Sequence, residues 1–313
     1  MILPWHPYGV SGALAVLVAF AIDRAFGEPP ARWHPVVWIG RALSACGAPW
    51  PRATARAQFA RGALAWLSMA VACVALAAAA DRAIGAAAGR IPGPGGAALH
   101  GLLLGAVLKP LLAWRMLREE VAAVEQALGR GVQAGRDRLR HIVGRDTSVL
   151  DITVIRESAL ESLSENLNDS WVAPLLWFAL GGLPGAALYR FANTADAMWG
   201  VRGRWEWAGK WAARADDVLS YVPARLTALL LAAAAGRWPG GLRREARRTA
   251  SPNGGWPMAT LALVLDVSLS RPGYYVLHEA GRAATSHDVA RALRIAARAA
   301  YAAAGLACLL ELA

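Results

Sequence analysis

The sequence has little charge, little cysteine and none of the short motifs by which many soluble enzymes are recognised. Charged residues make up 18% of its 313 residues, against about 25% in an ordinary soluble domain. The cysteines, Cys46, Cys73 and Cys308, are far apart and form no C-x-x-C pair, so neither a disulfide nor a zinc site is indicated. We expect them to be small core residues.

The missing motifs exclude several classes of active site. The sequence has no P-loop, no H-E-x-x-H zinc motif, no G-x-S-x-G elbow and no dinucleotide fingerprint. Any nucleotide must therefore be bound by a different arrangement. The net charge is +11, but the arginines flank apolar segments and do not alternate with aromatic residues, so nucleic-acid binding is not expected.

Apolar residues are in excess, at 56% of the chain. The runs 62–80 and 10–22 are uncharged, and the second extends back through 1–9 with only His6 as a titratable side chain. Further candidate spans are 97–114, 171–189, 222–235 and 296–310. We expect an all-α, polytopic membrane protein, formed as one domain over residues 1–313 with polar loops that face the cytoplasm. The shorter runs could instead be buried core helices or re-entrant segments.

The run 171–189 is not expected to be a straight helix, because Pro174, Gly181, Gly182, Pro184 and Gly185 interrupt it. Broken helices occur at membrane depth where they line a cavity or pack inside protein.

The basic residues predict a topology. Arginines are frequent between the first two candidate spans and after the third, and scarce between the second and third. The positive-inside rule then places the first and third connections in the cytoplasm. Many of these arginines could simply set topology and contact anionic lipid. Asp23-Arg24 follows the first apolar run where a signal peptide would have a cleavage site, so we expect that helix to be retained.

Most of the remaining polar residues lie between residues 144 and 223. Asp146, Thr147 and Ser148 offer N-cap side chains, which predicts a helix from there to about Asp169. Apolar residues at spacings of three and four predict one buried face of this helix: Ile152, Ile155, Ala159, Leu163 and Leu167.

Acidic residues follow the opposite face of the same helix at spacings of four: Glu157, Glu161, Glu165 and Asp169. Like charges at this spacing destabilise a helix by about 0.2–0.5 kcal/mol per pair. The stripe is therefore either a solvated face or a set of carboxylates matched by arginines or Mg²⁺, with Asn166 and Asn168 as neutral ligands beside them.

Further polar clusters surround Asn193–Asp196 and Asp216-Asp217. Taken singly they are typical of helix caps. In a region flanked by apolar segments they indicate a functional site, because ionisable groups at membrane depth are candidates for function. The turns around His34 and Asn253 predict rigid loops, in which His34 is either a structural hydrogen bonder or a site residue.

Four segments, in one order and spacing from about residue 22 to 275, resemble a known family. They are DRAFGEPPARWHPVVWIGR, then GRDTSVLDITVIRESALESLSENLNDSWVAPLLWFALGGLPGAALYRFANTADAMWG followed by ARADDVLSYVPARLT, and finally SPNGGWP. They resemble the adenosylcobinamide-phosphate synthase family of cobalamin biosynthesis (CobD/CbiB). The resemblance implies a multi-pass protein of the bacterial inner membrane with its active site facing the cytoplasm.

The same resemblance implies an amide ligation that consumes ATP. The carboxylate of adenosylcobyric acid, a corrinoid, would be joined to the amine of (R)-1-amino-2-propanol or of its O-phosphate. A carboxylate does not condense with an amine unaided, so ATP would form an acyl phosphate, with Mg²⁺ and arginines stabilising the phosphoryl charge. Expected partners are therefore the corrinoid, aminopropanol phosphate and membrane lipids, and a homo-oligomer is compatible with this.

Site roles follow from matching positions and side-chain chemistry. The expected catalytic residues are His34 as general base, with Glu161, Glu165 and Asp169. The expected substrate and phosphate contacts are Arg145, Asn166, Asn193, Arg214, Arg225 and Asn253. The expected metal ligands are Glu165, Asp169, Asp196, Asp216 and Asp217.

The chain departs from the family pattern after SPNGGWP, where LALVLDVSLSRPGYY replaces a glycine-rich stretch, and also at Ala195 and Glu28. Two other classes stay open. One is a non-catalytic membrane regulatory protein like the beta-lactamase-induction protein AmpE, which would not need the acidic and amide motifs. The other is a transporter, which often shows internal repeats; the sequence shows none.

Overall fold

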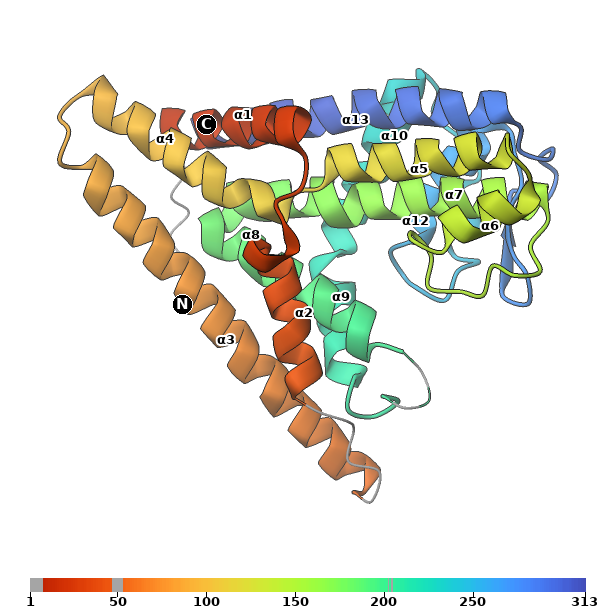
Figure 1. Ribbon diagram of the computed structural model, residues 1–313, viewed down its shortest axis with the longest axis horizontal. Coiled ribbons are helices and arrows are strands. Elements are labelled where there is room, and N and C mark those ends of the chain that lie inside the picture. The colour runs from red at the N-terminus through yellow and green to blue at the C-terminus, as the bar shows by residue number, and fades with distance from the viewer. Residues whose placement is uncertain (1–7, 47–52, 202, 204) are drawn as a thin grey trace. The chain divides into compact units, whose positions relative to one another are not determined.

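The computed structural model describes residues 8–46, 53–201, 203 and 205–313, and it is helical apart from one hairpin (Figure 1). Its elements are α1 (Val10–Phe26), η1 (Ala31–Trp33), α2 (Pro35–Ala45), α3 (Ala55–Ala88), α4 (Pro94–Leu108), η2 (Lys109–Leu111), α5 (Trp114–Leu128), α6 (Val132–Leu139), α7 (Ile152–Leu167), the π-helical turn η3 (Asn168–Val172), α8 (Ala173–Trp199), α9 (Lys210–Leu219), α10 (Tyr221–Ala235), α11 (Leu242–Ala246), α12 (Gly255–Leu265), β1 (Leu269–Arg271), β2 (Tyr275–Leu277) and α13 (Ser286–Leu312).

The predicted fold class, an all-α protein with several membrane spans, is confirmed. Within the described residues, 4 helical stretches are long and apolar enough to cross a membrane, and a bent pair, α9 with α10, raises the number to 5 if it forms one span. The four are Ala55–Ala88, Pro94–Leu128, Ile152–Trp199 and Ser286–Leu312. The N-terminal run predicted through residues 1–9 lies largely outside the described residues.

Helix α3 shows most clearly why a membrane is needed. Its 34 residues would extend about 50 Å, and only 11% of its most apolar window is buried within the protein. Leu64, Val71 and Leu76 are each at least two-thirds exposed. A contiguous apolar surface of this kind on a soluble monomer would be exceptional, so these side chains face lipid.

The chain divides into two compact units. Unit 1 contains Met1–Ala113, Ala173–Ser220 and Ala304–Ala313, and unit 2 contains Trp114–Val172 and Tyr221–Ala303. Each unit is assembled from segments that are far apart in the sequence. The single domain predicted over residues 1–313 stays a prediction.

Unit 1 is formed by long apolar helices that pack in pairs. Helix α1 lies along α4 (Figure 1), and α8 packs against α3, α2 and α9. One buried cluster joins Trp66 of α3 to Phe191 and Trp199 of α8. Small residues allow close approach: a Cβ at Gly105 of α4 would lie 2.6 Å from the carbonyl oxygen of Ala15.

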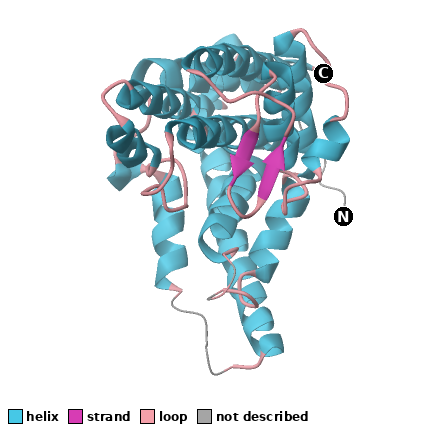
Figure 2. Cartoon of the chain, turned by 90° about the vertical axis from the view of Figure 1, so that its right-hand side faces the viewer, coloured by secondary structure: helices cyan, strands magenta, loops and turns pink. Residues whose placement is uncertain are grey.

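Unit 2 surrounds α7 with α5, α6, α12 and the hairpin. The two strands of the hairpin are antiparallel (Figure 2). Their register pairs Ser270 with Val276. Leu269 and Leu277, the partners at one end of this pairing, are fully buried. The hairpin thereby holds residues 269–277 against the acidic helix, since β1 packs on α7.

The predicted start of the acidic helix was wrong. Helix α7 begins at Ile152, because Asp151 is its N-cap and accepts a hydrogen bond from the Val154 amide at 2.9 Å. Asp146 instead accepts from the Ser148 amide in the preceding turn. Sequence reasoning passed over Asp151, which is nearer to the apolar repeat and whose side chain caps the helix.

The prediction that 171–189 is not a straight helix is confirmed. Within α8 the chain is non-helical at Gly181 and Gly182, and Gly182 has φ 62° and ψ −159°. The Leu183 amide freed by this kink donates to the Tyr8 hydroxyl at 3.3 Å, and that hydroxyl donates to Asp81 at 2.8 Å. The Leu183 amide that the kink frees therefore has its hydrogen-bond acceptor within unit 1.

The kink gives a stability prediction with a matched control. In Gly182→Ala the backbone would occupy a region that is almost exclusive to glycine, at about 1–3 kcal/mol, and the new Cβ would overlap the Tyr8 hydroxyl. Gly181→Ala adds a methyl where no atom lies within 4 Å. We expect thermal unfolding in detergent to occur several degrees lower for Gly182→Ala only. Equal midpoints of thermal unfolding for the two variants would contradict the glycine-specific conformation at Gly182.

Candidate functional site

A polar pocket of about 270 Å³ lies in unit 2, beside α7. It is lined by the segment before α7, by one face of α7 and by one residue from each hairpin strand: Ile142, Val143, Gly144, Arg145, Ser158, Glu161, Ser162, Glu165, Asn166, Arg271 and Tyr275. Four of the predicted site residues, Arg145, Glu161, Glu165 and Asn166, are thus brought together.

Burial is the first property of the acidic stripe. Glu157 is 4% exposed and Glu161 is 2% exposed, so the interpretation of the stripe as a solvated face is wrong for these two residues. Each carboxylate has a partner. Glu161 forms an ion pair with Arg145, and Glu157 accepts hydrogen bonds from the backbone amide and the hydroxyl of Ser270. Pairing of this kind is what a buried carboxylate requires.

Some polar atoms around the pocket are left without a protein partner. Among the described residues, one nitrogen of Arg145 (Nη1), one oxygen of Glu161 (Oε1) and Nε of Arg271 are buried with no hydrogen-bond partner. Each such group costs about 1–3 kcal/mol. Two donors and one acceptor therefore remain available for water or for a ligand that has both anionic and cationic groups.

Glu165 is the acid that the pocket exposes. It lies one helical turn from both Glu161 and Asp169 and experiences the negative charge of both. The turn before α12 also approaches it, because a Cβ at Gly254 would lie 3.0 Å from Oε1 of Glu165. Asp169, in η3, accepts from the side-chain amide of Asn168 at 2.8 Å.

Tyr275 brings a phenol to the same pocket. Burial raises the pKa of Tyr275, and the carboxylates of Glu161 and Glu165 raise it further. The phenol therefore keeps its proton at neutral pH. It is a hydrogen-bond donor on the hairpin side of the pocket, near the Glu161 carboxylate, and its hydroxyl donates to the sulfur of Met258 at 3.7 Å.

Asn166, Arg225 and Asn253 have largely structural contacts. The Asn166 side-chain amide donates to the carbonyl oxygen of Ser162 at 2.9 Å. The Arg225 guanidinium donates to Asn253 Oδ1 and to the carbonyl oxygens of Pro252 and Tyr221, both at 2.9 Å. Arg225 thus fixes the turn before α12, and its predicted phosphate contact would have to replace these bonds.

His34 belongs to unit 1, in a buried ionic cluster with Asp23, Glu28 and Lys109. Lys109 is 2% exposed, and its ammonium group lies 2.7 Å from Glu28, 3.3 Å from Asp23 and 3.2 Å from the Leu112 carbonyl oxygen. Burial would raise the pKa of Glu28, but hydrogen bonds from His34 and Lys109 outweigh it and hold that pKa below its usual value.

Both ring nitrogens of His34 are engaged in this cluster. Nδ1 accepts from the Val36 amide at 3.2 Å and so caps α2, which leaves the proton of a neutral ring on Nε2, 3.0 Å from Glu28. The contacts of His34 are therefore those of a structural hydrogen bonder. The predicted role of general base would require one of these bonds to be released.

The remaining predicted residues also belong to unit 1. Asn193 accepts from Arg190 at 3.3 Å, and Asp196 lies half-buried near the end of α8. On α9, Arg214 is 76% exposed and pairs with Asp217 at 3.4 Å. Asp216 accepts from the Ser220 hydroxyl at 3.5 Å.

The predicted metal ligands are divided between the units: Glu165 and Asp169 in unit 2, and Asp196, Asp216 and Asp217 in unit 1. Within the described ranges, no group of three or more His, Cys, Asp or Glu side chains is placed to hold a metal ion. Mg²⁺ does not need such a group, since it is usually bound through one or two carboxylates with water and substrate phosphates. Glu165 and Asp169 fit that pattern.

Sequence reasoning missed Arg271 and Tyr275 in the pocket and Lys109 in the cluster. The segment RPGYY was noted only as a departure from the family pattern, although Pro-Gly between polar and aromatic residues is a turn signal that can start a hairpin. Lys109 could have been noticed because it is a lone cation within an apolar run.

Residues 16–300 match the sequence model of the CobD/CbiB protein family. A probable cobalamin biosynthesis protein CobD of Thermococcus kodakarensis is 38% identical over 280 residues, 89% of each chain. A cobalamin biosynthesis protein CobD of Rhodobacter capsulatus is 40% identical over 273 residues, 84% of this chain and 83% of the relative. A Brucella anthropi protein of the same name is 38% identical over 275 residues, 82% of this chain and 81% of the relative. No solved structure matches significantly.

The buried cluster gives a prediction that uses the only two lysines of the chain, Lys109 and Lys210. Lys109→Met would leave the carboxylates of Asp23 and Glu28 buried without their cation, which typically costs about 3–5 kcal/mol. Lys210→Met removes an exposed pair with Glu206, worth under about 1 kcal/mol. Denaturation in detergent measures the loss of stability in each variant. Near-equal stabilities would show that Lys109 does not neutralise the cluster.

Proposed function

The chain belongs to the CobD/CbiB protein family and has a role in cobalamin biosynthesis, and on that premise we propose that it joins adenosylcobyric acid to (R)-1-amino-2-propanol O-phosphate, or to the free aminopropanol, in an ATP-dependent amide ligation. The product would be adenosylcobinamide phosphate or adenosylcobinamide. The proposal rests on the resemblance of four segments to the synthase family and on the chemistry of the pocket beside α7.

The observation that carries the proposal is the pairing of unsatisfied donors and an unsatisfied acceptor in one small pocket. Aminopropanol phosphate has the complementary groups, an ammonium and a phosphate joined by a short carbon chain. A volume of about 270 Å³ suits such a molecule and is at the low end for ligand pockets. A corrinoid ring is far larger, so we assign the pocket to the amine substrate.

Each group of the amine substrate has a partner. Oε1 of Glu161 would accept a hydrogen bond from the ammonium group, while Nη1 of Arg145 and Nε of Arg271 would donate to phosphate oxygens. Planar guanidinium groups bind phosphate with two parallel hydrogen bonds and are suited to this task. The Tyr275 hydroxyl, which keeps its proton, would be a further donor once it exchanges its weak bond to Met258 for one to the phosphate.

The reaction would proceed in two steps. A corrinoid carboxylate oxygen would take the γ-phosphoryl group of ATP, releasing ADP and leaving an acyl phosphate. The amine nitrogen would then attack the acyl carbon, forming the amide bond and expelling phosphate. The ammonium must lose a proton before it attacks, and we assign the acceptance of that proton to the carboxylate of Glu161 or Glu165.

We assign the Mg²⁺ to Glu165, which lines this pocket, and to Asp169, which lies four positions further along the chain and does not line it; substrate phosphates would complete the ligands of the metal. Glu165, the exposed acid, and Asp169 would hold it, and when bound it would neutralise phosphate charge. The proposed reaction needs ATP, so we further propose that the protein lies in the bacterial inner membrane with this pocket on the cytoplasmic side, as the arginine distribution predicts.

The ligation can be tested on the full chain purified in detergent. Adenosylcobyric acid, ATP, Mg²⁺ and either amine are incubated, and corrinoid mass and nucleotide products are followed together. We expect a corrinoid heavier by the amine minus water, formed only with ATP and Mg²⁺. Folded protein that gives no product with either amine would favour the non-catalytic, AmpE-like alternative.

The amine assignment makes a prediction about KM. Arg271→Gln removes one of the two free donors of the pocket, and the loss of a charged hydrogen bond of about 1.5–3 kcal/mol should raise the KM for aminopropanol phosphate by tenfold or more. The KM for free aminopropanol should change little, because that substrate has no phosphate. Arg130→Gln, at an exposed site outside the pocket, is the control. An equal rise for both amines would refute the phosphate contact.

The metal assignment is tested by Glu165→Gln and Asp169→Asn. Each removes one carboxylate charge, so we expect turnover at saturating ATP to need a tenfold higher Mg²⁺ concentration or to be lost. Asp217→Asn, in unit 1, tests the other predicted ligands in the same titration. Unchanged turnover and Mg²⁺ dependence in the first two variants would rule out Glu165 and Asp169 as ligands.

A further inference from the structure

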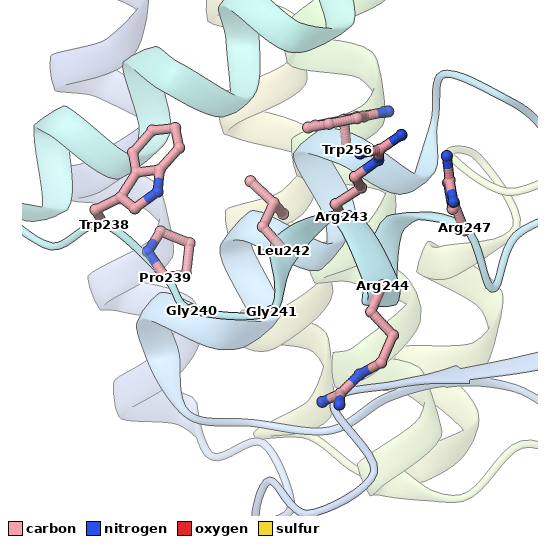
Figure 3. Close-up of a pocket in the computed structure, with 9 residues that line it drawn as sticks. All are labelled: Trp238, Pro239, Gly240, Gly241, Leu242, Arg243, Arg244, Arg247 and Trp256. Atoms are coloured by element: carbon pink, nitrogen blue, oxygen red, sulfur yellow. The ribbon is translucent and has the colours of Figure 1, made fainter.

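A second cavity lies in unit 2, at the segment that joins α10 to α11. It is an open groove of about 890 Å³, and it shares no lining residue with the pocket beside α7. Three arginines and two tryptophans define it: Arg243, Arg244, Arg247, Trp238 and Trp256 (Figure 3). We call it the Arg–Trp groove.

The groove carries uncompensated positive charge. Glu245 is the acid of α11, and it pairs with Arg244 at 3.4 Å and Arg248 at 3.0 Å. Arg243 and Arg247 are exposed and have no ion pair or hydrogen bond with any described side chain. They are four positions apart and lie on one side of α11, whereas Arg244 extends the other way (Figure 3). Two free guanidinium groups therefore line the groove together.

The walls of the groove are aromatic and apolar. Trp238 is 64% exposed, which is a large apolar surface to leave in water. Trp256 is fixed from elsewhere in unit 2, because the Arg225 guanidinium lies 4.8 Å from its ring centroid and is itself bonded to Asn253. The groove thus presents one exposed and one fixed tryptophan beside the free cations.

The Arg–Trp groove lies at the end of an apolar helix. Helix α10, the second half of a bent candidate span, ends at Ala235, and Trp238 follows directly after the turn. Tryptophan is enriched where a span meets the membrane–water boundary. Basic residues just beyond a span bind anionic headgroups.

We propose that the Arg–Trp groove binds a phosphate group that is attached to an apolar or aromatic portion. Arg243 and Arg247 would hold the phosphate oxygens through paired hydrogen bonds, and Trp238 and Trp256 would pack against the attached portion. Such a phosphate belongs either to an anionic phospholipid at the boundary or to a soluble phosphorylated compound. The inference does not depend on the proposed ligation, because no residue of the groove is assigned a role in it.

The test measures binding to the full chain in dodecyl maltoside, without corrinoid or ATP. The probes are phosphatidylglycerol, with phosphatidylcholine as the net-neutral lipid control, and inorganic tripolyphosphate. Bound lipids are counted by native mass spectrometry, and tripolyphosphate binding is followed by calorimetry. The variant Arg243→Gln/Arg247→Gln is compared with Arg130→Gln/Arg294→Gln, which removes the same charge at exposed sites outside the groove.

We expect at least one anionic probe to bind wild-type protein and the control pair alike, and at least tenfold more weakly to the Arg243→Gln/Arg247→Gln variant. Arg243→Lys/Arg247→Lys, which keeps the charge but not the planar donors, should give an intermediate affinity. Binding of phosphatidylglycerol alone assigns the phosphate to a lipid, and binding of tripolyphosphate assigns it to a soluble compound. Equal binding by the Gln pair and the control pair, or no binding of either anionic probe to wild type, would overturn the proposal.

Discussion

The burial of carboxylates within an apolar helical protein is the constraint on which the rest of unit 2 depends. Glu157 and Glu161 lie on α7 with almost no exposure, and a buried carboxylate is tolerated only when charge and hydrogen bonds compensate it. The compensation comes from distant segments of the sequence: Arg145 from the turn before α7 and Ser270 from β1. The acids therefore fix how the preceding loop and the hairpin lie against α7, and the pocket is what remains between them.

The segment that departs most from the family pattern acquires a role through this constraint. Residues 269–277 form the hairpin, from which Ser270 satisfies Glu157 while Arg271 and Tyr275 face the pocket. The same principle appears in unit 1, where Lys109 lies against Asp23 and Glu28, and His34 completes the set. In both units the charges are buried in compensated groups. In the pocket beside α7, buried atoms of Arg145, Glu161 and Arg271 without a hydrogen-bond partner belong to residues that line one small cavity, where a ligand can reach them.

The sequence predicted the helical membrane fold because long uncharged runs such as 62–80 have few other stable forms, and it predicted the break in α8 from Gly181 and Gly182. It also predicted that Glu161 and Glu165 would share one helix face, and the structure places both in the pocket together with two further predicted site residues, Arg145 and Asn166. It could not predict long-range partners. Arg271 approaches Glu161 only because the hairpin folds back on α7, and the side-chain contacts of Arg225 with Asn253 likewise depend on tertiary packing. The start of α7 was misplaced for a local reason: Asp146 and Asp151 have the same capping side chain, and the prediction used the earlier one, whereas Asp151 caps the helix.

The central claim is that incomplete compensation makes this pocket the site of the amine substrate. An experimental structure of the full chain with aminopropanol phosphate bound would test it most directly. The account predicts the phosphate between Arg145 and Arg271 and the ammonium group at Glu161, with Tyr275 in contact. A ligand found outside the pocket, or one bound there with its phosphate toward Glu161 and Glu165, would contradict it.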